Sequence, residues 1–402
     1  MSDLYLTSLA NKVRLRIGPW RLADNSRRFA RPTCPEAGGG RSTFFCARNW
    51  PVLLGWGSNE FQQLGSRAVI EHDHIYTPME IHINSANSDC PVLALPSSVE
   101  STPAVLVVAG GGTTACIQNH LLRIWGSMLD YLLPLIEAGG GSSSRLLTKV
   151  TIREVENVAI GHDHMLILLT SGKVVAIGNN SHGQCAGPFT FVLCQGDLVL
   201  VEESDSNGDS VFSFQRKQRL ETLSLVGGTV NVLKLATGLR HSAATTSDGS
   251  LYTWGDCSHD QVLQTNHNND GPEARSSVDG EILLDSVACT PLWRPPSGAK
   301  LVDVCCGAKH TVVVDTAGRI WTFGNNKYGS LGRNTASSRS TSTLHKGVPE
   351  IVEGLPEGVM WQRVSDDGSS IIVFCLDSDN SLHLHACMIG VVWMVTYCRS
   401  RS

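Results

Sequence analysis

Three histidines could carry acid–base or metal chemistry, because a neutral imidazole serves both as a general base and as a metal ligand. They are His164, His241 and His310. Each lies 3 residues after one glycine and 8 residues before another. Residues that recur with the same neighbours occupy equivalent positions of a repeat, and such positions are spread around a structure. The pattern therefore favours histidines that hydrogen-bond the surrounding backbone over a catalytic or metal-binding set.

Four fixed points define the repeat. Each copy has an opening glycine, a histidine, a glycine in a short polar turn and a closing glycine after an apolar run. The points are Gly161, His164, Gly172 and Gly178 in the first copy, Gly238, His241, Gly249 and Gly255 (after Trp254) in the second, and Gly307, His310, Gly318 and Gly324 in the third. Self-similarity of this kind indicates a repeat architecture.

The runs on either side of the turn glycine predict β-strands. In the first copy, residues 165–169 and 174–177 are apolar and flank Ser171-Gly172. Two such runs around X-Gly predict a β-hairpin with a two-residue loop, where glycine reaches positive φ without a Cβ clash. The closing glycine indicates close backbone packing near a central axis. One hairpin cannot bury its own faces, so several must stack.

Weaker copies extend the pattern in both directions. The offset from Gly57 to Leu64 equals that from Gly324 to Leu331, which is 7 residues. A degraded copy spans 109–126, with Thr113 in the position of the histidine. A half-copy near 364–374 has Ser369 there and lacks a following Trp-Gly. The repeats therefore cover roughly residues 50 to 375.

These motifs resemble the repeat of the regulator of chromosome condensation family. The best single match is the run 324–332, Gly-Asn-Asn-Lys-Tyr-Gly-Ser-Leu-Gly. The resemblance implies an all-β fold, a β-propeller usually of seven blades, with several blades degenerate here. Within the family the chain resembles the domain-containing subtype. That subtype also has few intact repeats, a weak second blade and a long insertion before its Cys-Gly-x-x-His copy, here 306–310.

Composition excludes several other classes of protein. The chain has 402 residues and a formal net charge of −5, which gives no general attraction to nucleic acid or to anionic lipid. It has no run of 18 apolar residues, so no membrane span is expected. Its 13 cysteines form no Cys-x-x-Cys pair and lie mostly within apolar runs, which favours a reduced intracellular chain.

The two ends differ in composition from the repeats. Residues 1–50 carry 9 Lys and Arg but 3 Asp and Glu, and they are interpreted as a basic, disordered segment. A mitochondrial transit segment is the alternative, because such segments are rich in Arg and poor in acids. The propeller is predicted over 51–375. Residues 376–402 form an atypical tail that does not continue the repeat and could supply a strand that closes the ring.

Two insertions interrupt the repeats, at about 188–232 and 256–296. The first carries the acidic residues Glu202, Glu203, Asp205 and Asp209. Loops on a rigid scaffold are where function concentrates, so these four residues form a candidate partner-binding insertion. Surface segments without a function are the alternative. Substitution of Glu202 and Glu203 by lysine is expected to leave folding intact and to abolish one partner.

Motifs for other chemistry are absent from the sequence. There is no Gly-x-x-x-x-Gly-Lys-Ser/Thr loop and no Gly-x-Ser-x-Gly elbow. The runs 72–74 and 383–385 each hold two alternating histidines, but metal sites need three or four ligands and no third is identifiable. We expect no catalytic residue, no cofactor and no metal.

Three hypotheses for function follow. The first is a non-catalytic interaction scaffold or regulator; the subtype resemblance then implies a histone-directed JmjC dioxygenase or histones as partners. The second is a guanine nucleotide exchange factor for a Ran-like GTPase, as in the founding member, and exchange activity stays open. The third is a mitochondrial relative of the same fold. The expected location is the nucleus, the cytoplasm or both.

Overall fold

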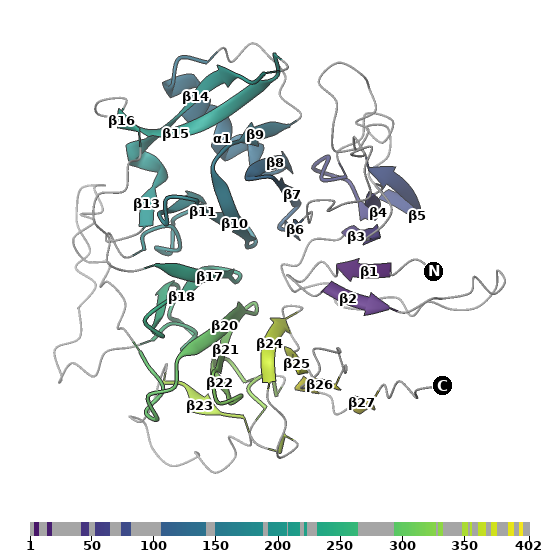
Figure 1. The fold of residues 1–402 in the computed structure, drawn as a ribbon, viewed down its shortest axis with the longest axis vertical. Coiled ribbons are helices and arrows are strands. Elements are labelled where there is room, and N and C mark those ends of the chain that lie inside the picture. The colour runs from purple at the N-terminus through teal and green to yellow at the C-terminus, as the bar shows by residue number, and fades with distance from the viewer. Residues whose placement is uncertain are drawn as a thin grey trace.

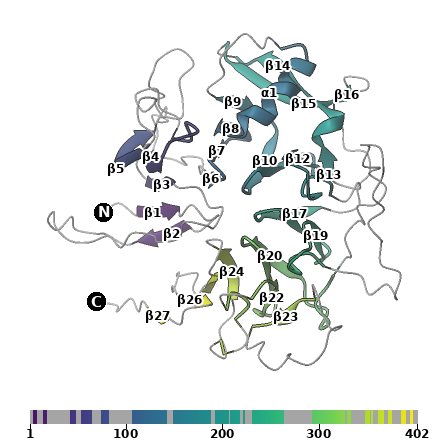
Figure 2. The same ribbon diagram turned by 180° about the vertical axis from the view of Figure 1, so that it is seen from behind.

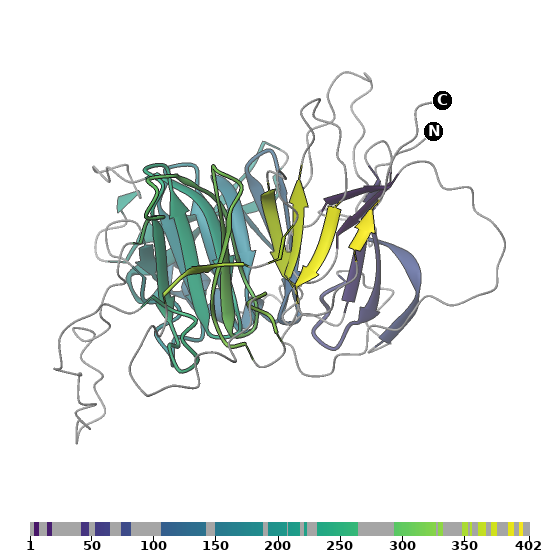
Figure 3. The same cartoon turned by 90° about the horizontal axis from the view of Figure 1, so that it is seen from below.

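The computed structural model describes residues 4–7, 14–17, 42–47, 53–64, 74–81, 106–141, 149–187, 192–206, 208–217, 221–222, 231–263, 293–326, 329–332, 348–352, 354–355, 361–366, 371–375, 385–389 and 394–396. Strands in these ranges form six sheets. Figure 1 shows the sheets arranged around a common axis in chain order, with β6, β10, β17, β20 and β24 nearest the centre. Figure 2 shows the same order from behind, and Figure 3 shows strands running in the direction of the axis.

The first three sheets hold the amino-terminal half. The first has the order β2-β1-β3-β4-β5 and is built from β1 (Leu4–Thr7), β2 (Arg14–Ile17), β3 (Ser42–Ala47), β4 (Leu53–Ser58) and β5 (His74–Ile81). The second holds β6 (Leu106–Gly110), β7 (Thr113–Gln118), β8 (Leu121–Gly126), β9 (Val150–Ile152), β14 (Leu198–Ser204), β15 (Ser210–Arg216) and β16 (Glu221–Thr222). The third is β10 (Val155–Ile160), β11 (His164–Leu169), β12 (Val174–Gly178) and β13 (Val192–Cys194).

Three further sheets follow in the carboxy-terminal half. They are β17 (Val232–Thr237), β18 (His241–Thr246) and β19 (Leu251–Gly255); β20 (Leu301–Cys306), β21 (His310–Asp315), β22 (Ile320–Gly324) and β23 (Glu350–Ile351); and β24 (Trp361–Asp366), β25 (Ile371–Cys375), β26 (His385–Ile389) and β27 (Met394–Thr396). The all-β propeller predicted from the repeats is therefore confirmed. The number of seven blades stays a prediction.

Each intact copy of the repeat has the same strand register. The histidine that opens the second strand pairs with the closing glycine of the third strand, as in His164 with Gly178, His241 with Gly255 and His310 with Gly324. The strand before the histidine carries an irregularity at its second residue in each of these sheets. Such a β-bulge increases the local twist. The fixed offsets in the sequence thus correspond to the lengths of the strands and of the turn in one hairpin.

The turn glycines have positive φ, but the loop is longer than predicted. The φ angles are 80° at Gly172, 86° at Gly249 and 71° at Gly318. The N–H of Gly172 donates to the carbonyl of Leu169, and the N–H of Leu169 donates to the carbonyl of Lys173. Three residues therefore form the loop, instead of the two expected. A tight turn followed by a left-handed glycine is the usual geometry of a three-residue hairpin.

Neighbouring sheets bury apolar layers between them. β17 packs on β10 and β11, β20 packs on β17 and β18, and β24 packs on β20 and β21. The layer between the third and fourth sheets includes Leu166, Ala176, Leu235 and Trp254, all buried. A strand in such a stack is covered on both faces, so its residues are apolar in a run and do not alternate with polar ones. This explains the unbroken apolar sequence of β11.

One helix was not predicted. Helix α1 (Leu129–Ala138) follows the closing glycine of the degraded copy, Gly126, and takes the place of the polar loop found in the other copies. Its buried residues are Leu129, Leu132, Leu135 and Ile136, which lie on one face of a helix. The helix packs on β14, and a Cβ added to Gly139 at its end would lie 2.2 Å from the carbonyl oxygen of Leu200.

Strands pair across both predicted domain limits. Before residue 51, β1 and β3 pair with each other and β3 pairs with β4 of the next segment. After residue 375, β26 pairs with β25 and β27 pairs with β26, so the described tail continues the last sheet. That the tail supplies a strand that closes the ring stays a prediction. The limits 1–50, 51–375 and 376–402 stay a prediction. Among the described residues, no helix has the length and apolar character needed to cross a membrane.

Candidate functional site

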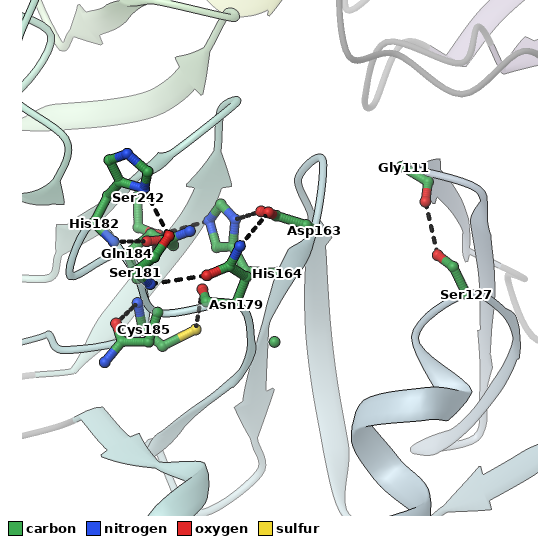
Figure 4. A network of polar contacts seen from close by, with 12 residues as sticks. Gly111, Ser127, Asp163, His164, Asn179, Ser181, His182, Gln184, Cys185 and Ser242 are labelled. Atoms are coloured by element: carbon green, nitrogen blue, oxygen red, sulfur yellow. Dashed lines mark hydrogen bonds and ion pairs between the residues drawn. The ribbon is translucent and has the colours of Figure 1, made fainter.

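The buried histidine of one sheet is hydrogen-bonded to a hydroxyl of the next. Nε2 of His164 lies 3.0 Å from Oγ of Ser242, and Nε2 of His241 lies 3.1 Å from Oγ1 of Thr311. Both rings have an exposed fraction of 0%. The rings reach side chains 78 and 70 residues further along the chain, in the next sheet. Figure 4 shows His164 directed at Ser242 across the gap between two sheets.

The same hydroxyl donates a hydrogen bond to the backbone carbonyl of a glutamine. Ser242 donates to the backbone oxygen of Gln184 at 2.9 Å, and Thr311 donates to that of Gln261 at 2.8 Å. A hydroxyl has one hydrogen, so each must accept its second hydrogen bond from the imidazole. The hydrogen of the ring is therefore on Nε2 in both His164 and His241.

Burial holds His241 in its neutral form. Loss of solvation, together with the nearby His310 and His164, lowers the pKa of His241 from 6.5 to about 3. A buried ring that donates to a neighbouring sheet has no route for proton exchange with a substrate. We therefore interpret these positions as links between sheets.

In two of the loops, the carbonyl of a glutamine at a constant offset accepts from a tryptophan. The indole N–H of Trp254 donates to the carbonyl of Gln184 at 2.9 Å, and that of Trp125 donates to the carbonyl of Gln63 at 2.7 Å. These glutamines were not predicted as part of the repeat. A signal was present, because Gln63, Gln184 and Gln261 each lie 6 residues after a closing glycine.

Internal hydrogen bonds fix two of the loops that carry these glutamines. The side-chain oxygen of an asparagine accepts from a backbone N–H five residues later in Asn59–Leu64, at 3.0 Å, and in Asn180–Cys185, at 2.8 Å. The loop after β22, with Ser330 in place of the glutamine, has the same bond in Asn326–Leu331, at 2.9 Å. The residue before the glutamine has a positive φ, which is 58° at Gln62 and 62° at Asp260. A loop fixed by its own hydrogen bonds presents its outer side chains in a constant position. We take this face of the ring as the candidate interaction surface.

The degraded copy replaces the histidine link with a local one. The hydroxyl of Thr113 accepts from the N–H of Met128 at 2.9 Å and lies 2.9 Å from Oγ of Ser127. Ser127 in turn donates to the carbonyl of Gly111 at 2.7 Å. Thr113 therefore anchors the start of helix α1. The copy that lacks the histidine is thus also the copy in which a helix replaces the polar loop.

The acidic insertion is a hairpin attached to an earlier sheet. β14 and β15 pair antiparallel, and β15 runs parallel to β9, with Phe212 opposite Ile152. Phe212 and Phe214 are buried in the core shared with helix α1. The described part of the insertion is thus an ordered extension of the second sheet. Residues 264–292 of the second insertion lie outside the described residues.

Cations of the second sheet balance part of the charge of this hairpin. Nη2 of Arg153 lies 2.9 Å from Oε2 of Glu203, and Oε1 of Glu203 accepts from Ser213 at 2.9 Å. Burial lowers the pKa of Arg123, while the nearby Asp209 and Asp205 raise it. Glu202 is exposed. Of the four predicted acidic residues, Glu203 is paired with Arg153, and Asp205 and Asp209 act on Arg123. That the replacement of Glu202 and Glu203 leaves folding intact stays a prediction.

No group of three His, Cys, Asp or Glu side chains within the described ranges could hold a metal ion. Of the run 72–74, the side chain of His74 is described, and its Nε2 lies 3.7 Å from Oε1 of Glu60. The run 383–385 lies outside the described side chains. The described part of the chain thus offers no set of ligands for a metal centre.

Family comparisons agree with the repeat. The model of the regulator of chromosome condensation (RCC1) repeat matches residues 155–184 and 301–330, and a second model of the same repeat matches 317–365. The chain is 29% identical over 290 residues to the ultraviolet-B receptor UVR8 of Arabidopsis thaliana, covering 70% of this chain and 51% of the receptor. It is 26% identical over 212 residues to the mouse RCC1 domain-containing protein 1, covering 48% of this chain and 49% of the relative. The chain thus spans about half the length of these two relatives.

Solved structures of low sequence identity share the fold. Human WBSCR16 superposes with a TM-score of 0.51 at 16% identity, covering 98% of this chain and 94% of that one. Yeast RCC1 (Prp20), solved with Kap60 bound, superposes with a TM-score of 0.50 at 16% identity, covering 85% and 66%. Taken with the register of its sheets, these matches show that the chain contains repeats of the regulator of chromosome condensation type on a β-propeller fold.

Proposed function

We propose that the protein is a non-catalytic interaction scaffold that binds protein partners through the rigid loops on one face of its ring. One observation carries the proposal. The polar side chains that recur in the repeat are buried and hydrogen-bonded from sheet to sheet, as in His164 with Ser242 and His241 with Thr311. The same links fix the loops outside them. Residues used in this way position a surface and do not perform a reaction.

A chromatin-linked partner is the one we propose first. The mouse RCC1 domain-containing protein 1 is among the relatives of the chain. The resemblance of the repeats to that subtype suggests a histone-directed JmjC dioxygenase, or histones, as partners in the nucleus. In the hairpin β14–β15, Glu202 is the acidic residue we propose for partner contact, because its side chain is exposed and Glu203 binds Arg153.

Partner capture from nuclear and cytosolic extracts tests the proposal. The full chain is immobilised, and bound proteins are identified by mass spectrometry. The matched control is the same chain with Gly161→Val, which disrupts the packing between two sheets. Recovery of a JmjC dioxygenase or of histones by the wild-type chain alone supports a chromatin scaffold. Equal recovery by the disrupted control contradicts specific binding by the folded ring.

A nucleotide-release assay separates the scaffold from exchange activity. Any small GTPase recovered is loaded with a fluorescent guanine nucleotide, and its release is followed with and without the full chain. Unchanged release supports a scaffold. Accelerated release of nucleotide from a Ran-like GTPase would overturn the non-catalytic assignment in favour of an exchange factor. Imaging of the tagged chain in cells gives its location, and exclusive mitochondrial signal would contradict the nuclear assignment.

A further inference from the structure

Two consecutive blades present the same polar loop. The loops are Ser181-His182-Gly183-Gln184, after β12, and Ser258-His259-Asp260-Gln261, after β19. In each loop the backbone N–H of the histidine donates to Oε1 of the glutamine at 2.8 Å. In each, the serine Oγ lies 2.8 Å from Nδ1 of the histidine. The two imidazoles are therefore held in matching positions, one on each blade.

A basic residue of the following blade meets each imidazole. Nη1 of Arg240 lies 3.3 Å from Nε2 of His182, and Nζ of Lys309 lies 3.3 Å from Nε2 of His259. Arg240 directly precedes the buried His241, and Lys309 directly precedes the buried His310. The side chains of Arg240, Ser181 and His182 are exposed, and Lys309 is half-buried. We call each set of serine, histidine and basic residue a cation unit.

The hydrogen bonds define which donors remain. Arginine and lysine only donate, so Nε2 of each histidine accepts and Nδ1 carries the hydrogen. Nδ1 then donates to the serine. The hydroxyl hydrogen of Ser181 is left to donate outward, whereas that of Ser258 goes to Asp256 of its own loop. The unit of Arg240 thus combines a positive charge with a hydroxyl donor, and the unit of Lys309 supplies the charge on a matching loop. This is the chemistry that recognises a carboxylate.

Neither basic residue has a carboxylate partner within the described part of the chain. By contrast, Arg153, Arg294 and Arg319 form ion pairs with Glu203, Asp248 and Asp315. Two acids lie in or beside the second loop, Asp256 and Asp260, and Asp256 interacts with both imidazoles. Partial burial opposes its ionisation, but hydrogen bonds from Ser258 and the nearby His182 and His259 hold the pKa of its carboxyl below the ordinary value. Asp256 is thus bound to its own loop, and no ion pair within the described residues joins it to Arg240 or Lys309.

We propose that the two cation units form a docking site for an acidic peptide segment of a partner protein, with one carboxylate bound at each blade. This inference rests on the proposed scaffold function and names the chemistry of one partner. A segment with more than one anion fits better than a single small ion, because the unit is duplicated on consecutive blades. Binding one segment at two fixed sites raises affinity through effective concentration.

Binding of a defined peptide tests the site. The probe is a fluorescein-labelled peptide of six glutamates, titrated with the full chain and followed by fluorescence anisotropy. Arg240→Glu with Lys309→Glu is expected to weaken binding by about tenfold or more, because both attractions become repulsions. The charge-preserving pair Arg240→Lys with Lys309→Arg is expected to retain binding within about threefold. Thermal melting establishes that both variants are folded.

The matched control reverses the same number of positive charges at another place on the surface. Arg216 and Lys217 are exposed at the end of β15, away from the cation units, and Arg216→Glu with Lys217→Glu alters the net charge by the same amount. Equal loss in this control would overturn the site, because binding would then depend on net charge alone. Absence of peptide binding by the wild-type chain, or equal competition by inorganic phosphate, would also overturn it. If partner capture from extracts persists in either case, the scaffold function stands and the cation units are not its site.

Discussion

Gly161 and Gly238 meet backbone to backbone across two neighbouring blades. A Cβ added at Gly161 would lie 2.7 Å from the carbonyl oxygen of Gly238, and one added at Gly238 would lie 2.5 Å from that of Gly307. Each of these positions also borders the ring of the histidine of its own copy. The opening glycine of the repeat is thus required by the contact between blades, since no side chain fits there.

Substitution of Gly161 by alanine is expected to destabilise the fold by about 2 to 3 kcal/mol, because backbone atoms of the next blade must move. Gly196 provides the matched control, since a Cβ there would meet no atom within 4 Å and its φ is not positive. The measurement is the free energy of unfolding in urea for both variants. Equal stability of the two would contradict the close approach of the blades.

The turn glycines separate the energetic cost of a strained φ from that of a steric contact at the added Cβ. Gly172 has positive φ and open space around its Cβ position, so Gly172→Ala is expected to cost about 1 kcal/mol from backbone strain alone. Gly249 has a similar φ, and its Cβ would also lie 2.9 Å from Cα of Lys300, so Gly249→Ala is expected to cost more, and Gly249→Val to prevent folding. Thermal unfolding of the three variants gives the order. A Gly249 variant that melts like the wild-type chain would show that this turn is wrongly assigned.

His241 predicts a loss of stability on acidification. Its folded-state pKa of about 3 lies below the ordinary 6.5, so the unfolded chain binds a proton first as the pH falls. The stabilising contribution is complete above pH 6.5 and is lost progressively down to about pH 3. Between about pH 6.5 and 5 the loss is about 2 kcal/mol.

His241→Gln tests this relation, because glutamine keeps a hydrogen-bond donor but does not titrate. Its free energy of unfolding is expected to be lower than that of the wild-type chain at neutral pH and to change less between the two pH values. Urea unfolding at both pH values provides the measurement. An unchanged slope in the variant would mean that other groups cause the acid sensitivity.

Glu203 and its neighbour Glu202 form a natural comparison. Glu203→Lys removes contacts with Arg153 and Ser213 and is expected to destabilise the hairpin by about 1 kcal/mol, a modest figure because both charged side chains are partly exposed. Glu202→Lys is expected to change stability by less than about 0.5 kcal/mol. Hydrogen exchange of the β14 and β15 amides reports the effect directly. Equal protection in the two variants would show that the ion pair does not hold the hairpin.

Local spacing predicted the parts of the fold that repeat. The offsets among Gly161, His164, Gly172 and Gly178 are those of one hairpin, and periodicity alone reveals them. The loop of three residues was missed because X-Gly also fits a two-residue turn. Helix α1 was missed because it stands where the other copies have a loop, although its apolar residues show helical spacing.

Contacts between distant segments could not be predicted in the same way. Nothing in the sequence near Ser242 or Thr311 indicates that their hydroxyls accept from a histidine of the preceding blade. The pairing of β15 with β9 joins segments separated by a complete sheet. Strand propensity identifies a strand but leaves its partner open, because pairing depends on tertiary context.

The return of β14 and β15 to the second sheet sets an order of assembly. During synthesis β9 emerges before the third sheet, but its outer neighbour β15 follows that sheet in the chain. Until residue 216 leaves the ribosome, the outer edge of β9 lacks its native partner, and an unpaired strand edge favours aggregation. The second and third blades therefore mature together, and a chain interrupted between them is expected to require chaperones that a chain continued past the hairpin does not.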